Sequence, residues 1–179
     1  MLDFAIRYQN ELTDLLRQTW MKEKYKFWNA TSFFEDFCFE SSTWVNHQFV
    51  SVRNEKVIGY IAYSINRADG DVVYNLQIIN FEDKPSMTFA KDLGQTLTDI
   101  FEKFRFRKLN FEVIVGNPAE KAYDKMIRRY GGRIVGCWKQ QARLFDGKYY
   151  DIKLYEIMRE NYLAEKEKRG NAKRCNFND

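Results

Sequence analysis

The chain has 179 residues, of which 45% are hydrophobic and 17% aromatic, and it carries a formal net charge of +4 at pH 7. This length suits a single α/β domain with a full core, and the composition excludes an intrinsically disordered protein. No stretch approaches the roughly 18 uninterrupted apolar residues of a membrane span, and the first residues lack the pattern of a secretion signal. We therefore expect a cytoplasmic protein without a membrane-spanning segment.

The few cysteine and histidine residues argue against a metal site. Cys38, Cys137 and Cys175 are far apart and lack metal-ligand spacing, and their odd number suits a reducing compartment. The single histidine, His47, begins a predicted strand, and we interpret it as a surface residue. A lone histidine also gives little support to a Ser–His nucleophile.

The first part of the chain predicts a short strand over residues 4–8 and a helix over residues 11–21. The stretch 24–44 that follows is unusually aromatic. Its rings either cover the sheet or form a lid over a ligand pocket, because aromatic walls are common in ligand clefts. If the stretch is a lid, the candidate substrate-binding residues are Trp28, Phe33, Phe34 and Phe37.

Three consecutive strands are predicted next, over residues 49–53, 57–65 and 72–81, and the first two form a hairpin. Gly59 inside the second strand indicates a bulge or a close backbone approach. In the third strand, period-2 alternation predicts that Asn75 and Gln77 share one face with Val73 and Ile79. These two polar side chains either meet solvent or line a cleft.

A capped helix and another strand follow. Ser86 or Thr88 is the predicted N-cap of a helix whose apolar residues begin at Phe89 and recur with a 3.6-residue period. This helix leads into a strand over residues 109–115. A strand, helix and strand in this order predict a crossover connection and at least one parallel strand pair.

The stretch 108–136 predicts strand, turn, helix, turn and strand. Asn117 is the predicted N-cap of the helix, with Glu120 at capping-box spacing, and Gly131 ends the helix in the left-handed region. Asn117 is either a plain cap or a cap that also reaches a ligand. A final hairpin extends to residue 158. We interpret residues 1–163 as one domain and residues 164–179 as a charged, solvated tail.

The second half of the chain contains several short motifs in a fixed order: Asn117 before a helix, Arg129-Tyr130-Gly131-Gly132 at its end, and Asp146-Gly147-Lys148-Tyr149-Tyr150-Asp151 in a turn. With the order of the elements, these motifs resemble the GCN5-related N-acetyltransferase (GNAT) superfamily, particularly the branch of ribosomal-protein N-terminal and antibiotic acetyltransferases. The resemblance covers residues 4–160. It implies an α/β (α+β) fold with a mixed, mostly antiparallel central sheet, a parallel splayed strand pair and about four flanking helices.

The resemblance also implies an activity. GNAT proteins use acetyl-CoA as cosubstrate, so the chain is expected to move an acetyl group to a primary amine of a small molecule or a protein N-terminus. The amine would attack directly in a ternary complex. The pyrophosphate would lie at the loop over residues 83–90, although the glycines of the family motif are absent there. The implied cofactor-binding residues are Ile78, Ile79, Asn80, Lys84, Ser86, Met87, Thr88, Phe89, Ala90 and Asn117.

The catalytic residues depart from the family pattern. Ile127 stands where many GNAT proteins have a tyrosine that protonates the leaving thiolate, and the strand over 72–81 has no carboxylate. Tyr123, one helical turn earlier, is the candidate acid, and Asn75 and Gln77 are candidates to orient a water molecule. The alternative is a catalytically silent GNAT-fold protein that binds a CoA ester or a protein partner. A homodimer is compatible with the sequence, whereas nucleic-acid binding would rest on the basic tail alone.

Overall fold

The computed structural model describes residues 1–20, 22–28, 38–40 and 43–175. Within these ranges the chain forms one seven-stranded sheet in the order β1-β2-β3-β4-β5-β7-β6. The strands are β1 (Leu2–Phe4), β2 (Asn46–Arg53), β3 (Lys56–Asn66), β4 (Val72–Asn80), β5 (Lys108–Ile114), β6 (Arg133–Arg143) and β7 (Tyr149–Met158). The α-helices are α1 (Gln9–Gln18), α2 (Met87–Thr98), α3 (Glu120–Tyr130) and α4 (Arg159–Cys175). Shorter turns are η1 (Ala5–Tyr8), η2 (Glu23–Tyr25) and the π-helical η4 (Asp99–Lys103).

The predicted fold class is confirmed. Neighbouring strands are antiparallel except for β4 and β5, which run parallel because α2 and η4 cross back between them. The predicted hairpin of β2 and β3 turns at Asn54 and Glu55, whose φ angles are 50° and 63°. Two consecutive residues with positive φ are the mark of a type I′ turn, which matches the twist of the flanking strands.

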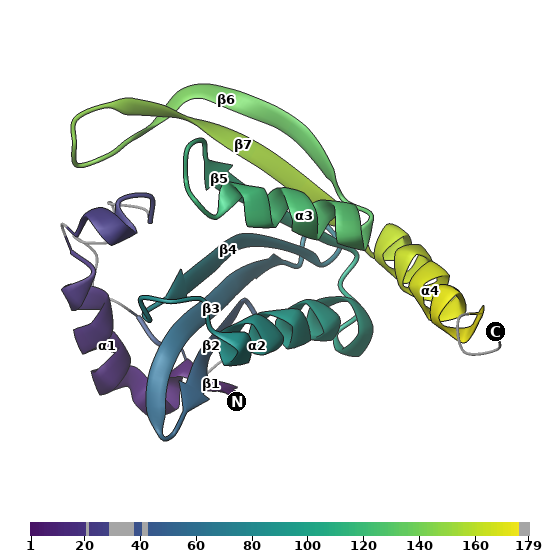
Figure 1. Ribbon diagram of the computed structural model, residues 1–179, viewed down its shortest axis with the longest axis horizontal. Coiled ribbons are helices and arrows are strands. Elements are labelled where there is room, and N and C mark those ends of the chain that lie inside the picture. The colour runs from purple at the N-terminus through teal and green to yellow at the C-terminus, as the bar shows by residue number, and fades with distance from the viewer. Residues whose placement is uncertain (21, 29–37, 41–42, 176–179) are drawn as a thin grey trace.

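Two hydrophobic cores lie on opposite faces of the sheet (Figure 1). On the first face, which we call the α2 face, the helices α2, α3 and α4 and the turn η4 cover the strands through residues such as Phe101 and Leu109. On the second face, which we call the α1 face, Leu12 and Leu16 of α1 pack against β2, β3 and Ile79 of β4. The described core on the α1 face includes no residue of β5, β6 or β7, so α1 covers only one half of the sheet.

The strand predicted over residues 4–8 is wrong. β1 ends at Phe4, and the chain turns at once into the 3-10 helix η1. The Asp3 carboxylate holds this turn by accepting hydrogen bonds from the Phe4 N–H (2.7 Å) and from Arg7 (2.9 Å). Ala5 is fully buried beside α1, so local side-chain hydrogen bonds and helix packing prevail over the alternating pattern.

His47 begins β2, as predicted, but its interpretation as a surface residue is wrong. The side chain is buried, with its ring 4.9 Å from the Tyr63 ring and 4.8 Å from the Phe104 ring, centroid to centroid. Nε2 donates to the Thr43 carbonyl (2.9 Å), and Nδ1 accepts from the Tyr63 hydroxyl (2.7 Å). Both ring nitrogens are therefore satisfied in the neutral form, which is how a buried polar group is tolerated.

α3 begins later than predicted. Its N-cap is Ala119 rather than Asn117, and no side chain caps that end. Asn117 instead closes a tight turn, because its Oδ1 accepts from the Ala119 N–H at 2.9 Å, and the Glu120 carboxylate accepts from the Gly116 N–H at 3.1 Å. Gly131 ends the helix with φ 70°, as the sequence predicts.

The C-terminal segment is helical, and its interpretation as a charged, solvated tail after residue 163 stays a prediction. α4 continues to Cys175, so most of the expected solvated tail is helical. Tyr162 is buried and stacks on Phe101 with 4.7 Å between ring centroids, and Lys166 bonds to Glu102 at 2.5 Å. In the described ranges no helix is long and apolar enough to span a membrane, and no His, Cys, Asp or Glu cluster could hold a metal ion.

Candidate active site

β4 and β5 separate soon after they begin. They pair only at Val72 with Lys108 and at Val73 with Leu109. Farther along, β4 stays paired with β3 and β5 stays paired with β7. In the described part of the chain, the facing edges of β4 and β5 therefore have no strand partner beyond these two pairs. Such an edge presents N–H and C=O groups that an extended ligand is able to bind.

A β-bulge at Asn75 accompanies this separation. Asn75 has φ 53°, and the pairing of β4 with β3 shifts there, so that Asn75 and Leu76 together oppose the single residue Tyr63. A bulge bends its strand and increases the local twist. We infer that this extra residue directs the remainder of β4 away from β5.

The bulge also corrects the predicted facing of β4. Val73 belongs to the core on the α2 face, whereas Ile79 belongs to the core on the α1 face. Strict alternation would place Val73, Gln77 and Ile79 together, and the extra residue breaks that alternation. Gln77 thus shares the α1 face with Ile79 but not with Val73.

A cavity of about 560 Å³ fills the gap between the two strands. All residues of β4 from 75 to 80 line it, and residues 112–114 of β5 form the opposite wall. Successive side chains of a strand point to opposite faces, so a cavity that touches consecutive residues of both strands passes through the sheet. The remaining walls come from η2 and the residues after it, the turn before α3 with Tyr123, and β6.

Tyr123 lies on the α2 side of this cavity. Its ring meets those of Phe111 and Tyr155 edge-on, with centroids 5.7 and 6.4 Å away. The hydroxyl has no hydrogen-bond partner among the described residues, where every buried polar side-chain atom has one, so the hydroxyl lies at the cavity surface. Burial raises the pKa of Tyr123 to about 12, which keeps the phenol protonated and able to donate at neutral pH. Its assignment as a general acid stays a prediction.

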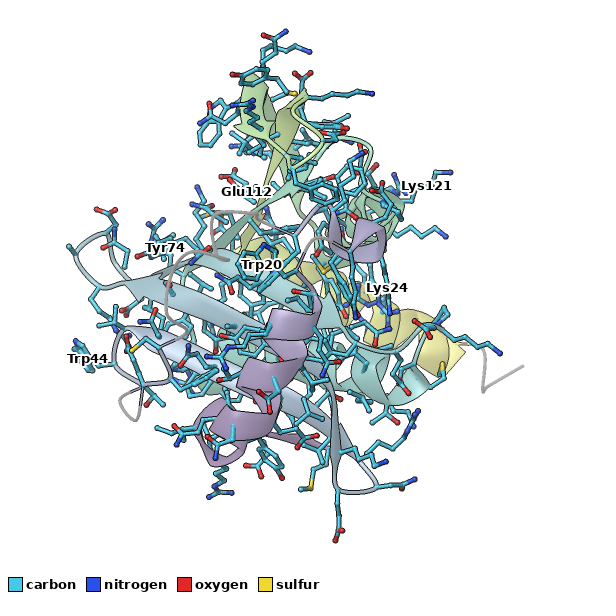
Figure 2. All side chains as sticks on the ribbon, turned by 90° about the vertical axis from the view of Figure 1, so that its left-hand side faces the viewer. Trp20, Lys24, Trp44, Tyr74, Glu112 and Lys121 are labelled. Carbon is cyan, nitrogen blue, oxygen red and sulfur yellow. The ribbon has the colours of Figure 1, made fainter. Side chains whose placement is uncertain are left out.

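Glu112 lies on the α1 side of the cavity, in the middle of β5, and the sequence analysis did not select it. Within the described chain its carboxylate forms no hydrogen bond or ion pair. Although Glu112 is exposed on its strand, the surrounding protein removes part of the water from the carboxyl group and raises its pKa above the ordinary value. Figure 2 shows Glu112 above Trp20, on the side of the molecule that also carries Lys24. A lone carboxylate between Phe111 and Val113 was the available signal, since an acid inside an apolar strand is uncommon.

No protein-family model matches the sequence. No curated protein matches it either. Solved structures do: the spermidine N-acetyltransferase from Vibrio cholerae in complex with CoA and spermine has 20% sequence identity and a TM-score of 0.67, with 91% of this chain and 97% of that chain covered. A structure of the enzyme SpeG from the same organism with manganese ions has 24% identity and a TM-score of 0.57, with 68% of this chain and 70% of that chain covered.

These neighbours are GNAT acetyltransferases, and the first similarity extends over nearly the whole of both chains. The chain has the GNAT fold. The fold that the resemblance implies is thus confirmed, while membership in the superfamily stays a prediction. The narrower similarity to the ribosomal-protein and antibiotic branch stays a prediction.

In this GNAT fold the loop between β4 and α2 is the predicted place of the acetyl-CoA pyrophosphate. Ser86 is the N-cap of α2, as predicted, and its hydroxyl accepts from the Phe89 N–H at 3.3 Å. The N–H groups of Met87 and Thr88 stay without a partner among the described residues, as expected in a first helical turn. Phe89 is buried against Gly59, where an added Cβ would lie 2.4 Å from the ring. The nearest neighbour at Gly59 is thus a side chain, and the predicted bulge is present, because the pairing of β2 with β3 shifts there and leaves Ile58 as an extra residue.

The same loop is tied to the wall of the cavity by Lys24. Its ammonium group donates to the carbonyls of Phe81 (3.2 Å) and Glu82 (2.9 Å) and to the Asp83 carboxylate (3.0 Å). Arg53 also pairs with the Glu82 side chain. The loop therefore has a fixed shape without the glycines of the GNAT motif.

Some of the predicted site residues line the cavity together, and others lie outside it. The predicted residues that line the cavity are Trp28, Asn75, Gln77, Ile78, Ile79, Asn80, Asn117 and Tyr123. Those outside its lining are Lys84, Ser86, Met87, Thr88, Phe89 and Ala90, which lie in or beside the first turn of α2. Phe33, Phe34 and Phe37 lie outside the described residues. The cavity thus covers the predicted reaction site, while the predicted phosphate site lies beyond it.

Proposed function

We propose that the protein is an acetyl-CoA-dependent N-acetyltransferase that acts on a primary amine of a small molecule or a peptide N-terminus. The observation that carries this proposal is the cavity that passes through the sheet between the unpaired edges of β4 and β5. A thioester held along β4 in this gap would be reachable by an amine from the other face. A neighbour with the same fold is an acetyltransferase in complex with CoA and spermine, and this supports a CoA ester and an amine as the two substrates.

Acetyl-CoA would supply the activated acetyl group, and the protein would supply position and polarity. Backbone N–H groups on the free edge of β4, near Ile79, would hydrogen-bond to the thioester oxygen and stabilise the negative charge that develops on it. Confinement of both reactants in one gap would remove much of the entropic cost of their encounter. Asn75 and Gln77 would orient a water molecule that carries the amine proton away.

The bonds and protons of this transfer balance without a further reactant. The neutral amine nitrogen forms a bond to the acetyl carbon, the carbon–sulfur bond breaks, and CoA leaves as a thiolate. An ammonium group gives up two protons on its way to an amide. One proton reaches the thiolate, by way of Tyr123 in this proposal, and the other is released to solvent.

The remainder of the CoA molecule would lie toward the α2 face. The free N–H groups of Met87 and Thr88, the positive end of the α2 dipole and the Lys84 ammonium group suit the pyrophosphate. The side-chain amide of Asn117 would donate to the chain that joins the pyrophosphate to the thioester. Because the loop lacks glycines, fewer N–H groups face the phosphates than in the family motif, and we expect modest affinity.

The test of this function is the effect of acetyl-CoA on thermal unfolding. A ligand that binds only the native state at 100 times its dissociation constant stabilises it by about 2.7 kcal/mol, so Tm should rise clearly. Lys84→Ala should weaken binding about two- to fivefold, because one exposed charge contributes at most about 1 kcal/mol. The absence of a shift with both acetyl-CoA and CoA would contradict the proposal. A shift without release of free thiol with any amine would favour the catalytically silent alternative.

Tyr123 provides a test of the proton path. Tyr123→Phe should lower kcat at least about tenfold and leave the affinity for acetyl-CoA within about twofold, because only the leaving thiolate loses its proton donor. Tyr130→Phe is the matched control on the same helix, since the Tyr130 ring stacks on Tyr162 with 5.5 Å between centroids and does not line the cavity. If neither variant changes the rate, solvent or the substrate supplies the proton.

The expected compartment is the cytoplasm, where acetyl-CoA is available and the free thiols of Cys38 and Cys137 stay reduced. The protein would act there as a monomer or as a homodimer. Size-exclusion chromatography with light scattering distinguishes these two states.

A further inference from the structure

Two tryptophan side chains contribute to the cavity wall on the α1 face. Trp138 of β6 lies opposite Ile152 of β7, which lies opposite Ile114 of β5. Cross-strand partners share a face, so Trp138 lies on the same face as Ile114 and Glu112. Trp28, which packs against the core on the α1 face, completes this wall.

Glu112 differs from the other carboxylates around the cavity because it has no ion-pair partner among the described residues. Four carboxylates that lie close to lining residues in the sequence or pair with them, but do not line the cavity themselves, are held by lysine side chains, in the pairs Asp83–Lys24 (3.0 Å), Asp146–Lys26 (2.9 Å), Asp151–Lys139 (2.8 Å) and Glu120–Lys153. Among the described residues that line the cavity, Glu112 is the acid without such a partner. The α1 side of the cavity thus offers one negative charge within apolar and aromatic surroundings.

We infer that the acceptor is a monoamine whose amino group is attached to an aromatic or apolar group, and that its ammonium form binds to Glu112. This inference rests on the proposed function, and it names the acceptor of the same site. An aromatic or alkyl substituent would lie against Trp28, Trp138 and Ile152, where burial of apolar surface and contact of a cation with an aromatic face both favour binding.

The same wall disfavours a polyamine. A second or third ammonium group would lie against Ile114, Ile152 or Trp138, and among the described residues the cavity lining has no carboxylate besides Glu112. Removing an unpaired charge from water costs several kcal/mol. The expected acceptor class therefore differs from that of the neighbour that holds spermine.

Glu112 would also receive the first proton of the reaction. An amine attacks only in its neutral form, so the bound ammonium group must transfer a proton before the carbon–nitrogen bond forms. The carboxylate of Glu112 takes that proton and later releases it to solvent, which keeps the balance of the reaction unchanged. Glu112 is exposed on its strand, but the protein around the carboxyl group removes part of its water and raises its pKa, which brings the carboxylate closer to the basicity that proton abstraction at neutral pH requires.

The experiment compares two amines and three proteins by the release of CoA thiol at saturating acetyl-CoA. For the wild type, kcat/KM with 2-phenylethylamine should exceed that with spermidine at least about tenfold. Glu112→Gln should lower kcat/KM for 2-phenylethylamine about 30-fold or more, the size of one hydrogen bond to a charged group, with the acetyl-CoA dissociation constant unchanged. Glu160→Gln is the control, because it removes the same charge from an exposed position on α4.

The outcomes separate this inference from the proposed function. Equal or faster turnover of spermidine would overturn the acceptor class and leave the acetyltransferase standing. Full activity of Glu112→Gln, with the acid limb of the pH profile of kcat/KM unchanged, would overturn the role of Glu112. If acetyl-CoA itself does not bind to the wild type, the proposed function fails first and the inference fails with it.

Discussion

β3 and β6 are strands of eleven residues each, both with a glycine in the fourth position, but they differ strongly in burial. Eight residues of β3 are buried, whereas β6 has none. β3 lies between two neighbouring strands with helices on both of its faces, while β6 is the outer strand and pairs with β7 alone (Figure 1).

The difference is not one of apolar content alone. β6 carries Ile134, Val135 and Trp138, and each of these is about half exposed, while comparable residues of β3 are enclosed. The pattern of a strand indicates which side chains are able to be buried, but a layer on that face must exist for burial to occur. The exposed half of the sheet is also the half that carries Glu112 and one wall of the cavity. In the proposed function, the exposed half would contribute to recognition of the acceptor, whereas β3 in the covered half contributes to stability.

Matched isoleucines give the largest expected contrast between the two strands. Ile61→Ala in β3 removes a fully buried side chain and should lower the free energy of unfolding by about 2 to 5 kcal/mol. Ile134→Ala in β6 removes a side chain that is 50% exposed and should cost less than about 1 kcal/mol. Urea unfolding of the two variants measures this contrast. A loss at Ile134 as large as that at Ile61 would show that another layer, such as a second copy, covers β6.

The two glycines sharpen the comparison at the level of single atoms. A Cβ at Gly59 would lie 2.4 Å from the Phe89 ring and 2.8 Å from the Ile79 carbonyl oxygen, so Gly59→Ala should destabilise the protein by about 1 to 3 kcal/mol. A Cβ at Gly136 would meet no atom within 4 Å. Gly136→Ala should therefore change the stability by less than about 0.5 kcal/mol. Thermal unfolding of both variants measures this difference. Equal losses of stability in the two variants would contradict it.

The stability of the covered half of the sheet should also depend on pH through His47, whose ring packs against Tyr63 of β3. Burial lowers the pKa of His47, with smaller effects in the same direction from Arg67 and Lys103, against the bond to the Thr43 carbonyl, which raises it. The folded state thus disfavours the protonated form of His47. The stability that comes from burying the neutral ring is present above the ordinary pKa of about 6.5 and is lost as the pH falls through the folded-state pKa. The expected fall in Tm between pH 7 and pH 5 is at most about 4 °C.

His47→Gln is the variant that isolates this effect. It keeps a polar side chain of similar reach but has no group that titrates in this range, so its Tm should depend less on pH than that of the wild type. An unchanged pH dependence would assign the effect to carboxylates elsewhere in the molecule.

Much of the architecture follows from the sequence because its determinants are local. The apolar periods of two and 3.6 residues give the order of strands and helices, and the crossover helix gives the parallel pair. The burial of His47 and the exposure of Glu112 could not be predicted in this way. Each depends on groups distant in the sequence, such as Phe104 beside His47 and Trp138 on the face of Glu112. Asn75 carries no local mark of its bulge, since asparagine adopts positive φ in many turns.

The gap between β4 and β5 depends on the one extra residue that the bulge at Asn75 adds to β4. Without this one residue, Tyr74 and Leu76 would be adjacent, every later side chain of β4 would keep its present face, and the register with β3 would become continuous. What the strand would lose is the bend, and a straight β4 would be free to stay paired with β5 beyond Val73. We therefore expect deletion of the single Asn75 codon, which removes one lining side chain and retains the others, to narrow the gap toward ordinary parallel sheet.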